Sequence, residues 1–371
     1  MRTIYTFLIF LILAFSCAAC STTSTNTDAS PIGMTRLELY DPDRLNWNMT
    51  GPRPLMTTIW YPADGSAEMV RIDIPKSPPS IFTGGFASPE APISSQQKTY
   101  PLIVMSHGTG GTALQMMWLG RELARNGYIV AAVDHHGNTA AEESFDPRGF
   151  RMPWERALDL TSVLDLLLDD PAWAPLIDED RIGAVGFSLG GYTVTALAGG
   201  RLDLQQFRAF CRSEASDATC DPQSEYPTAQ ADFEAILKTD PTLVDHMEQH
   251  SNSFKDERIR TVVAIAPALG QGLTTDSLSE IALPYVSIVG DLDSIAPAIS
   301  NADRINAHIP GVTGHIIQGA NHYAFLNQCL YPAALNVPVC EDHPRGIPRE
   351  MAHTQAQRIT LDFPQENLKK Q

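Results

Sequence analysis

A serine between two glycines is the first feature of the sequence that could do chemistry. Residues 186–191 read Gly-Phe-Ser-Leu-Gly-Gly and place Ser188 in a Gly-x-Ser-x-Gly pattern. Residues 181–185, Arg-Ile-Gly-Ala-Val, predict a strand before it, and residues 192–198 predict a helix after it. A nucleophilic serine needs such a strand, sharp turn and helix, because its dihedral angles are strained and the flanking glycines avoid clashes. We predict that Ser188 is a nucleophile; the alternative is a glycine-rich corner.

A serine nucleophile needs a base, and around this kind of turn the chain order is serine, acid, histidine. His322 lies in the loop after the last expected strand, residues 314–317, and we predict that it is the base. His315 falls inside that strand and is expected to be a buried structural residue. His343 and His353 lie among Pro, Arg and Glu residues and are expected to face solvent.

Two aspartates are candidates for the acid that orients the base. Asp291 and Asp293 follow the expected strand 285–290, and a carboxylate at that end of a strand can reach the base. Asp293 precedes a helical pattern that Pro297 opens, so we favour Asp293 and keep Asp291 as the alternative. Either aspartate could instead cap a helix or stabilise a turn.

A glycine-rich segment supplies candidate oxyanion donors. Residues 107–111 read His-Gly-Thr-Gly-Gly and follow the expected strand 102–106. Glycines let the backbone turn so that an N–H group points at developing negative charge. We expect the backbone N–H groups of Thr109 and Leu189 to be these donors, and His107 to stabilise the turn rather than act as a second base.

Alternating strands and helices must position these residues. Apolar runs predict strands over residues 102–106, 128–133, 181–186, 260–266, 285–290 and 314–317. Helical patterns lie over residues 114–125, 154–168, 189–198 and 297–308. Apolar strands that alternate with helices predict an α/β fold with a mostly parallel central sheet, covered by helices on both faces.

Further segments complete the expected domain, which spans residues 34–371. Residues 35–40 and 54–61 alternate as an antiparallel pair, and residues 62–100, rich in Pro, Ser and Gly, read as a long surface connection. Residues 201–255 have two helical patterns and no convincing strand. This insertion either only packs on the core or forms a lid. A lid is considered because insertions in such sheets project where ligands bind.

The first twenty residues predict an export signal. Arg2 precedes an apolar run, residues 4–15, that ends in small residues and is too short for a transmembrane helix of about 20 residues. Residues 13–17 resemble a bacterial lipoprotein box in which Cys17 is lipidated, and Cys20 is a second candidate. The alternative is ordinary signal-peptidase cleavage.

After that signal, the polar residues 21–33 are expected to be a flexible tether. Four cysteines remain, and an exported protein in an oxidising compartment can join them as disulfides. Their spacing suggests the local pairs Cys211–Cys220 and Cys329–Cys340, although four cysteines allow three pairings. The alternatives are free thiols or a metal site, which no Cys-x-x-Cys spacing among these four supports.

Composition excludes several classes of protein. The chain has 371 residues, of which 43% are hydrophobic and 19% charged, a globular balance that excludes disorder or a coiled coil as the main architecture. A net charge of −17 has the wrong sign for nucleic-acid binding. The paired histidines at 135–136 have no third ligand nearby, so we predict no metal and no cofactor.

With Ser188, Asp293 and His322 in this order, the chain resembles the α/β-hydrolases. More narrowly, residues 53–340 resemble bacterial proteins grouped with dienelactone hydrolases and with plasma-type platelet-activating-factor acetylhydrolases. The segments that carry this resemblance include Ile-Trp-Tyr-Pro at 59–62, the His-Gly segment at 107–111 and Trp-Glu-Arg-Ala-Leu-Asp-Leu at 154–160. The acid loop, residues 290–297, is similar to that of bacterial cutinases and polyester hydrolases.

The resemblance implies hydrolysis of carboxylic esters through an acyl-enzyme, with a short-chain or phospholipid-like ester as the partner. Dienelactone hydrolases proper carry a cysteine where this chain has Ser188, which argues against their particular lactone opening. An exported amidase or peptidase of the same fold is the alternative, followed by a non-catalytic surface binding protein.

An acidic chain is not drawn to anionic lipid, so membrane attachment would depend on the lipidated cysteine. The sequence does not indicate an oligomeric state.

Overall fold

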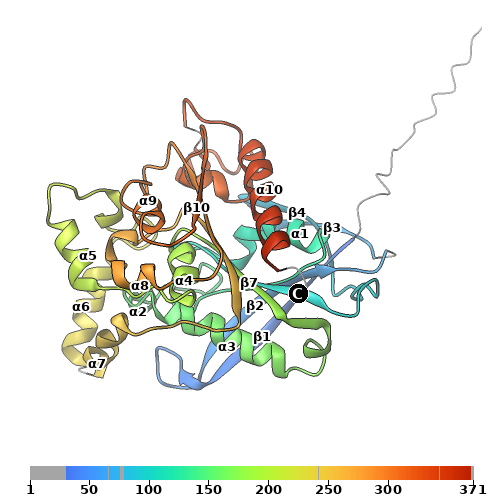
Figure 1. Cartoon of the computed structure of the whole chain (residues 1–371), viewed down its shortest axis with the longest axis horizontal. Helices are drawn as coiled ribbons and strands as arrows, with labels where there is room; N and C mark the ends of the chain where they lie inside the picture. Colours follow the sequence, from blue (N-terminus) through green and yellow to red (C-terminus); the bar gives the residue numbers. More distant parts are fainter. Residues whose placement is uncertain (1–30, 66, 76–78, 241, 342, 369–371) are drawn as a thin grey trace, which may run out of the picture.

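One sheet of eleven strands organises the chain (Figure 1). The computed structural model describes residues 31–65, 67–75, 79–240, 242–341 and 343–368. The strand order is β10-β9-β8-β7-β5-β6-β2-β1-β4-β11, with β3 paired to β4. The strands are β1 Ile32–Leu45, β2 Pro52–Pro62, β3 Val70–Ile74, β4 Phe82–Pro89, β5 Tyr100–Ser106, β6 Ile129–Val133, β7 Ile177–Phe187, β8 Ile259–Ile265, β9 Tyr285–Gly290, β10 Thr313–Ile317 and β11 Gln328–Cys329.

The strands from β5 to β10 are parallel to one another, and they include all six that the apolar runs predict. Every residue of β5, β6 and β9 is buried, because helices cover both faces of this half of the sheet. The carboxyl ends of parallel strands meet at one edge, so the loops after β5, β7, β9 and β10 come together there. The predicted mostly parallel sheet is confirmed.

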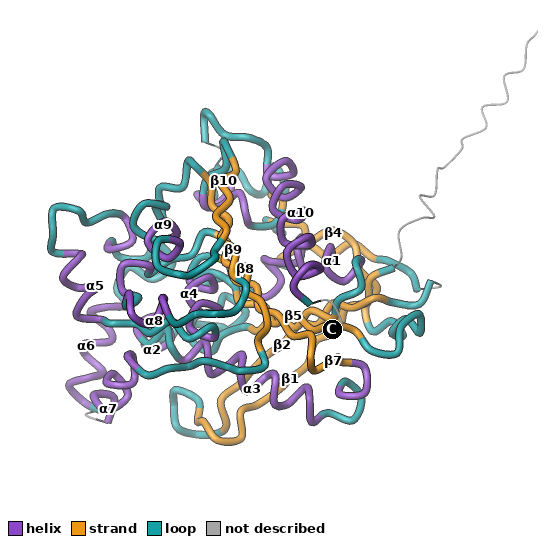
Figure 2. Tube along the Cα trace, in the orientation of Figure 1, coloured by secondary structure: helices purple, strands orange, loops and turns teal. Residues whose placement is uncertain are grey.

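Two helical layers enclose the sheet (Figure 2). Apolar residues of α3 (Glu155–Asp169) and α4 (Leu189–Leu197) pack in one core cluster. Those of α1 (Met117–Arg125) and α10 (Arg349–Asn367) pack in a second cluster on the other face. The remaining helices are α2 Pro147–Arg151, α5 Leu204–Cys211, α6 Ala229–Thr239, α7 Thr242–Glu248, α8 Thr275–Ser279 and α9 Ala302–Asn306.

The structure differs from the expected secondary structure in several places. Residues 62–100 are not only a surface connection, because they hold the antiparallel pair β3 and β4. The helix expected over 297–308 is restricted to α9, and residues 298–300 form a turn. The nineteen-residue helix α10 was not expected at all.

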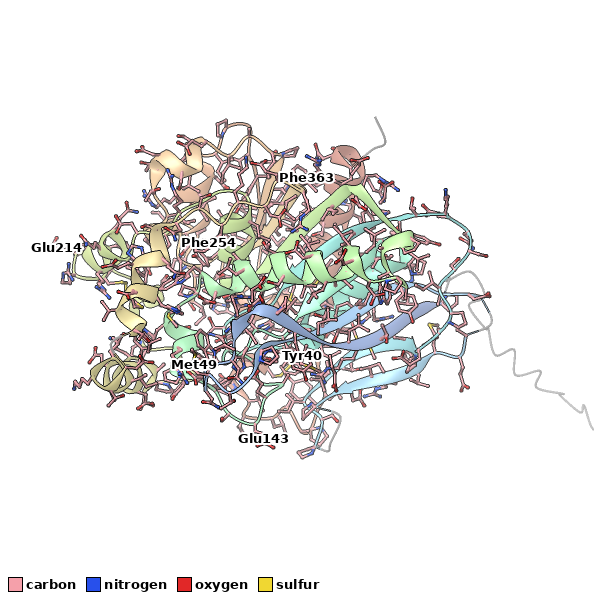
Figure 3. All side chains as sticks on the ribbon, turned by 90° about the horizontal axis from the view of Figure 1, so that it is seen from below. Tyr40, Met49, Glu143, Glu214, Phe254 and Phe363 are labelled. Carbon is pink, nitrogen blue, oxygen red and sulfur yellow. A yellow bond between two sulfur atoms is a disulfide. The ribbon has the colours of Figure 1, made fainter. Side chains whose placement is uncertain are left out.

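The insertion at 201–255 carries the helices α5, α6 and α7, and Figure 3 shows its Glu214 at one edge of the molecule. Disulfides join Cys211 to Cys220 within it and Cys329 to Cys340 elsewhere, the two pairs that the spacing suggests.

The expected signal and the lipidation candidates Cys17 and Cys20 lie outside the described residues, as does most of the expected tether. β1 begins at Ile32, inside the segment assigned to that tether. Among the described residues, no helix has the length and apolar character needed to cross a membrane.

Candidate active site

Ser188 lies on the tight turn between β7 and α4. Its φ of 57° and ψ of −117° are strained for a residue with a side chain. A Cβ on Gly186 would lie 2.0 Å from the carbonyl oxygen of Gly190, and one on Gly190 would lie 2.0 Å from that of Ser106. Both glycines of the Gly-x-Ser-x-Gly pattern are therefore required by close backbone contacts.

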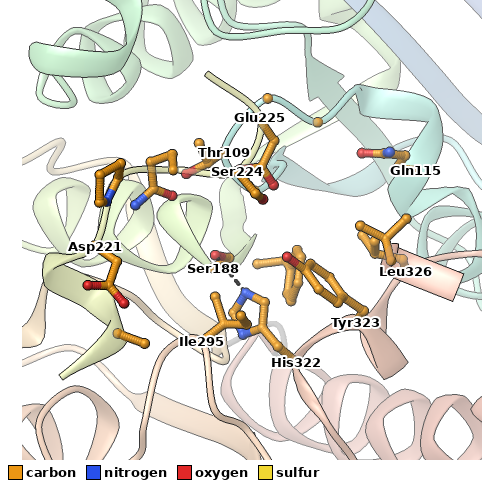
Figure 4. Close-up of a pocket in the computed structure, with 18 residues that line it drawn as sticks. Thr109, Gln115, Ser188, Asp221, Ser224, Glu225, Ile295, His322, Tyr323 and Leu326 are labelled. Carbon is orange, nitrogen blue, oxygen red and sulfur yellow. Dashed lines mark hydrogen bonds between the residues drawn. The ribbon is translucent and has the colours of Figure 1, made fainter. Parts of the chain in front are cut away.

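A chain of two hydrogen bonds links Ser188, His322 and Asp293. His322 Nε2 lies 2.9 Å from Ser188 Oγ (Figure 4). On the other side of the ring, His322 Nδ1 lies 2.7 Å from Asp293 Oδ2. All three residues are buried, and they stand on the loops that follow β7, β9 and β10. Because Nδ1 donates to the carboxylate, Nε2 is left to accept the proton of the serine hydroxyl.

The two candidate acids have different contacts. Asp293 Oδ1 accepts hydrogen bonds from the backbone N–H groups of Ile295 at 3.0 Å and Ala296 at 2.8 Å, which leaves Oδ2 for His322. Asp291 is exposed, and its Oδ1 accepts the N–H of Gly319 at 2.5 Å. The structure thus brings Asp293 to the histidine, whereas Asp291 stabilises a corner between two loops.

The candidate oxyanion donors flank the serine. Gly108 packs against Ser188, since a Cβ on Gly108 would lie 3.3 Å from the serine Cβ. Thr109 follows in the loop and lines the same cavity as Ser188. Leu189 begins α4, where the first N–H groups of a helix have no partner within it. Within the described part of the chain, neither the Thr109 N–H nor the Leu189 N–H donates to another backbone oxygen.

A cavity of about 300 Å³ opens over this cluster. One wall holds Phe187, Tyr323 and Leu326. The opposite wall comes from the insertion, through the segment 217–225, which we call the strap. Its lining includes the carboxylates Asp221 and Glu225, and none of the described lining residues is Lys or Arg. The sequence could not assign these acids to the site, because their position depends on how the insertion docks.

Polar contacts hold the strap in place. Thr219 Oγ1 accepts hydrogen bonds from Gln271 Nε2 and Asn301 Nδ2, each at 3.2 Å. Ser300 Oγ donates to Asp217. Glu225 packs on the loop after β5, since a Cβ on Gly110 would lie 2.9 Å from the Glu225 Cβ. The insertion therefore forms part of the cavity wall, in the position that a lid would occupy.

Two expected structural histidines lie in a buried polar network behind the His-Gly segment. His107 Nδ1 donates to the Gly108 carbonyl at 2.6 Å, and its Nε2 accepts the backbone N–H of His135 at 3.2 Å. His135 Nδ1 lies 3.0 Å from Asp159, and its Nε2 lies 2.9 Å from Ser106 Oγ. Burial lowers the pKa of His135 to about 3 and that of His107 well below its usual range, so both rings are neutral.

His136 contacts Glu142 Oε1 through Nδ1 at 2.7 Å. Among the described residues, no group of three or more His, Cys, Asp or Glu side chains is arranged to hold a metal ion.

Two other histidines differ from expectation. His353 is buried rather than solvated: its ring stacks on Trp118 with centroids 4.0 Å apart, and its Nε2 lies 2.9 Å from the Leu326 carbonyl oxygen. Burial lowers the pKa of His353 to about 4. His315 is only partly buried, because β10 is the edge strand of the sheet. The unexpected helix α10 accounts for the burial of His353, which stands on it.

The sheet order, the two helical layers and the turn at Ser188 define an α/β-hydrolase fold. A ferulic acid esterase from Streptomyces cinnamoneus has this fold at a TM-score of 0.58 and 19% sequence identity, over 91% of this chain and 90% of that one. The family model for platelet-activating factor acetylhydrolase, isoform II, matches residues 85–152.

Relatives of several kinds match parts of the sequence. The cutinase est2 of Thermobifida alba is 32% identical over 123 residues, which are 33% of this chain and 37% of that protein. The platelet-activating factor acetylhydrolase of Bos taurus is 26% identical over 275 residues, 60% of each chain. The chain therefore spans about a third of the length of the cutinase, and less than two thirds of the acetylhydrolase.

Proposed function

We propose that the protein hydrolyses carboxylic esters with Ser188 as the nucleophile, His322 as the base and Asp293 as the orienting acid. The hydrogen-bonded chain of these three residues, which opens into the cavity, is the observation that carries the proposal. The similarity to cutinases, to an acetylhydrolase and to a ferulic acid esterase supports an ester as the substrate.

The first half of the reaction forms an acyl-enzyme. Ser188 Oγ attacks the ester carbonyl carbon while His322 Nε2 takes the hydroxyl proton, and Asp293 stabilises the imidazolium that results. The carbonyl oxygen becomes an oxyanion between the N–H groups of Thr109 and Leu189, and each such donor contributes about 3 kcal/mol in comparable sites. When the carbon–oxygen bond of the ester breaks, His322 returns its proton to the leaving alcohol.

The second half releases the acid. Water attacks the acyl-enzyme as His322 takes one of its protons, and the second tetrahedral intermediate collapses to the carboxylic acid and free Ser188. The positive end of the α4 dipole lies at Ser188 and favours negative charge there. No step requires a cofactor.

The cavity favours a short acyl group. Its volume of about 300 Å³ is at the lower end of the range for small-molecule sites. The strap closes one side, while Ile295 on the rim is exposed. We therefore propose short-chain esters as substrates, and phospholipid-like esters when the long chain or head group can remain outside.

We also propose that the protein is exported and held at a membrane by a lipid on Cys17 or Cys20. The support is the residue pattern of the first twenty positions, together with two disulfides, which persist in oxidising compartments. Labelling cells with a fatty-acid probe tests this, because loss of label in Cys17→Ala or Cys20→Ala would identify the modified residue. Retained label in the double variant would contradict lipidation at either cysteine.

A substrate series tests the proposed activity. The wild-type protein is assayed with p-nitrophenyl esters from acetate to palmitate, with a short-chain phospholipid, and with the matching p-nitroanilides. The proposal predicts the highest kcat/KM for acetate to hexanoate and much slower cleavage of amides. Faster amide cleavage would favour an amidase or peptidase, and no turnover of any substrate would favour a binding protein.

A further inference from the structure

A buried arginine lies behind the two candidate oxyanion donors. Arg156 of α3 is only 1% exposed, and its guanidinium donates to four oxygen atoms. Nε lies 3.2 Å from Thr193 Oγ1, and Nη1 lies 3.3 Å from Asn138 Oδ1. Nη2 donates to the His107 carbonyl and lies 3.3 Å from Ser106 Oγ. One side chain thereby joins α4, the loop after β6 and the segment that ends β5.

The contact with Thr193 connects Arg156 to the helix that begins after Ser188. The Thr193 hydroxyl donates to the carbonyl oxygen of Leu189 at 3.0 Å while it accepts from Arg156. Leu189 carries one of the two proposed oxyanion N–H groups. Arg156 therefore constrains the first turn of α4 through a single intervening hydroxyl.

The remaining contacts connect Arg156 to the loop of the other donor. The guanidinium of Arg156 donates a hydrogen bond directly to the carbonyl oxygen of His107. Asn138 Oδ1, which accepts from Arg156, also accepts the backbone N–H of Gly110 at 2.7 Å. His107 and Gly110 stand on either side of Thr109 in the chain. The Thr109 backbone thus lies between the His107 carbonyl, which bonds Arg156 directly, and the Gly110 N–H, which is linked to Arg156 through Asn138.

The charge of Arg156 is unusual for a buried group. Among the described residues, Arg156 forms no ion pair, and its four acceptors are neutral oxygens. Asp159, one helical turn later, is held by Arg53 at 2.7 Å and by His135 at 3.0 Å. Burial lowers the pKa of Arg156 to about 9, although Asp159 opposes the shift. A buried cation without a close counter-ion is costly, so stability alone is a poor reason for its presence.

We propose that Arg156 is a positioning residue that sets the Thr109 and Leu189 N–H groups at the separation an oxyanion needs. The inference rests on the ester hydrolysis proposed above. Arg156 acts from behind the two segments and does not line the cavity described here. Its loss should therefore weaken binding of the tetrahedral transition state while leaving substrate binding almost unchanged.

The variants Arg156→Met and Arg156→Lys of the whole protein test this. We expect Arg156→Met to lower kcat with p-nitrophenyl butyrate by about 100-fold and to change KM by less than about threefold. Arg156→Lys should show an intermediate loss, because one ammonium cannot bond Thr193 and His107 with the guanidinium's fork geometry. Phenylboronic acid, which forms a tetrahedral adduct with an active serine, should lose affinity in proportion to kcat.

Two further variants separate positioning from folding. Arg44 also pairs with Asp159, at 2.7 Å, and contacts neither oxyanion segment. Arg44→Met should therefore lower stability but leave kcat and boronic-acid affinity within about threefold. Thr193→Val removes only the hydroxyl between Arg156 and Leu189, and should lower kcat about fivefold to tenfold. It tests the inference even if the Arg156 variants do not fold.

Unchanged kcat in Thr193→Val and in any folded Arg156 variant would overturn the inference. So would a change confined to KM, or an equal loss of kcat in Arg44→Met. An inactive wild-type protein would overturn the proposed function and this inference with it. An active wild-type protein whose variants keep their kcat would overturn the inference alone.

Discussion

The loops that carry Ser188, Asp293 and His322 differ from the strap in how they are held. The three loops follow parallel strands of the central sheet, and close backbone contacts leave little freedom around the serine. The strap belongs to an insertion whose helices are mostly half-exposed, and side-chain hydrogen bonds and one disulfide hold it. The sheet therefore fixes the groups proposed to react, whereas the insertion shapes the cavity above them. Changes in the loops should alter rate, and changes in the strap should alter selectivity.

The largest effect is expected from Ser188→Ala. This change removes the proposed nucleophile without adding volume, and kcat for p-nitrophenyl butyrate should fall about 10⁶-fold, as in serine hydrolases that lose their nucleophile. Stopped assays at high enzyme concentration measure the residual rate. Activity within tenfold of wild type would contradict the role of Ser188, whatever the state of the strap.

The two aspartates provide a matched pair within the loops. Asp293→Asn leaves the shape of the loop but removes the carboxylate that is hydrogen-bonded to His322, so kcat should fall about 10⁴-fold. Asp291→Asn changes an exposed residue bonded to Gly319 and should cost less than about threefold. The reverse order of losses in steady-state kinetics would reassign the acid.

A charge change in the strap should alter selectivity rather than rate. Glu225 lines the cavity and is half-buried, so Glu225→Gln removes one negative charge close to the substrate. Relative to a neutral ester, kcat/KM for an ester with a carboxylate on its acyl group should rise about fivefold, as expected for one charge near a solvated surface. Glu214→Gln, an exposed acid elsewhere in the insertion, is the control. An equal change for both esters would argue against an electrostatic role.

The smallest effect on kcat is expected from opening the disulfide of the insertion. Replacing Cys211 and Cys220 by serine should loosen the strap, raise KM about threefold and leave kcat within about twofold, because the proposed reacting groups lie on other loops. The same replacement of Cys329 and Cys340 is the comparison pair. Limited proteolysis should cut the first variant within the insertion before the rest of the chain. Loss of kcat without a change in KM would mean that the strap positions the reacting groups.

The parallel strands and the turn at Ser188 were predictable because their signals are local. An apolar run that ends in Gly-x-Ser-x-Gly reports both the strand and the close backbone contact that needs glycine. Asp293 and His322 could then be chosen because each follows an expected strand, in the chain order serine, acid, histidine. These residues needed no knowledge of distant contacts.

Strand β4 and the burial of His353 were missed because their causes are distant in sequence. Gly84 and Gly85 read as loop residues. A Cβ on Gly84 would, however, lie 2.4 Å from Met117 Sδ. Gly85 has a φ of +88° and packs against the side chain of Arg121. His353 stands among polar residues and is buried because α10 packs it on Trp118. In both cases the partner lies on α1, more than 30 positions away, and the local pattern of the segment does not report it.

The contacts of Arg156 were hidden for the same reason. The segment 154–160 resembles known hydrolases, but no pattern within it reports the acceptors at His107, Asn138 and Thr193. The pocket-lining acids of the strap likewise depend on the docking of Thr219 against Asn301. The structure was needed for both features.

Labelling with a fluorophosphonate probe tests the central claim most directly, because the probe reacts only with a serine that a neighbouring base has activated. The wild-type protein is labelled, digested and mapped by mass spectrometry. We predict one adduct, on the peptide that contains Ser188, with no adduct in Ser188→Ala and a strongly slowed reaction in His322→Ala. An adduct on another residue, or ester hydrolysis by a protein whose Ser188 never reacts, would contradict the account.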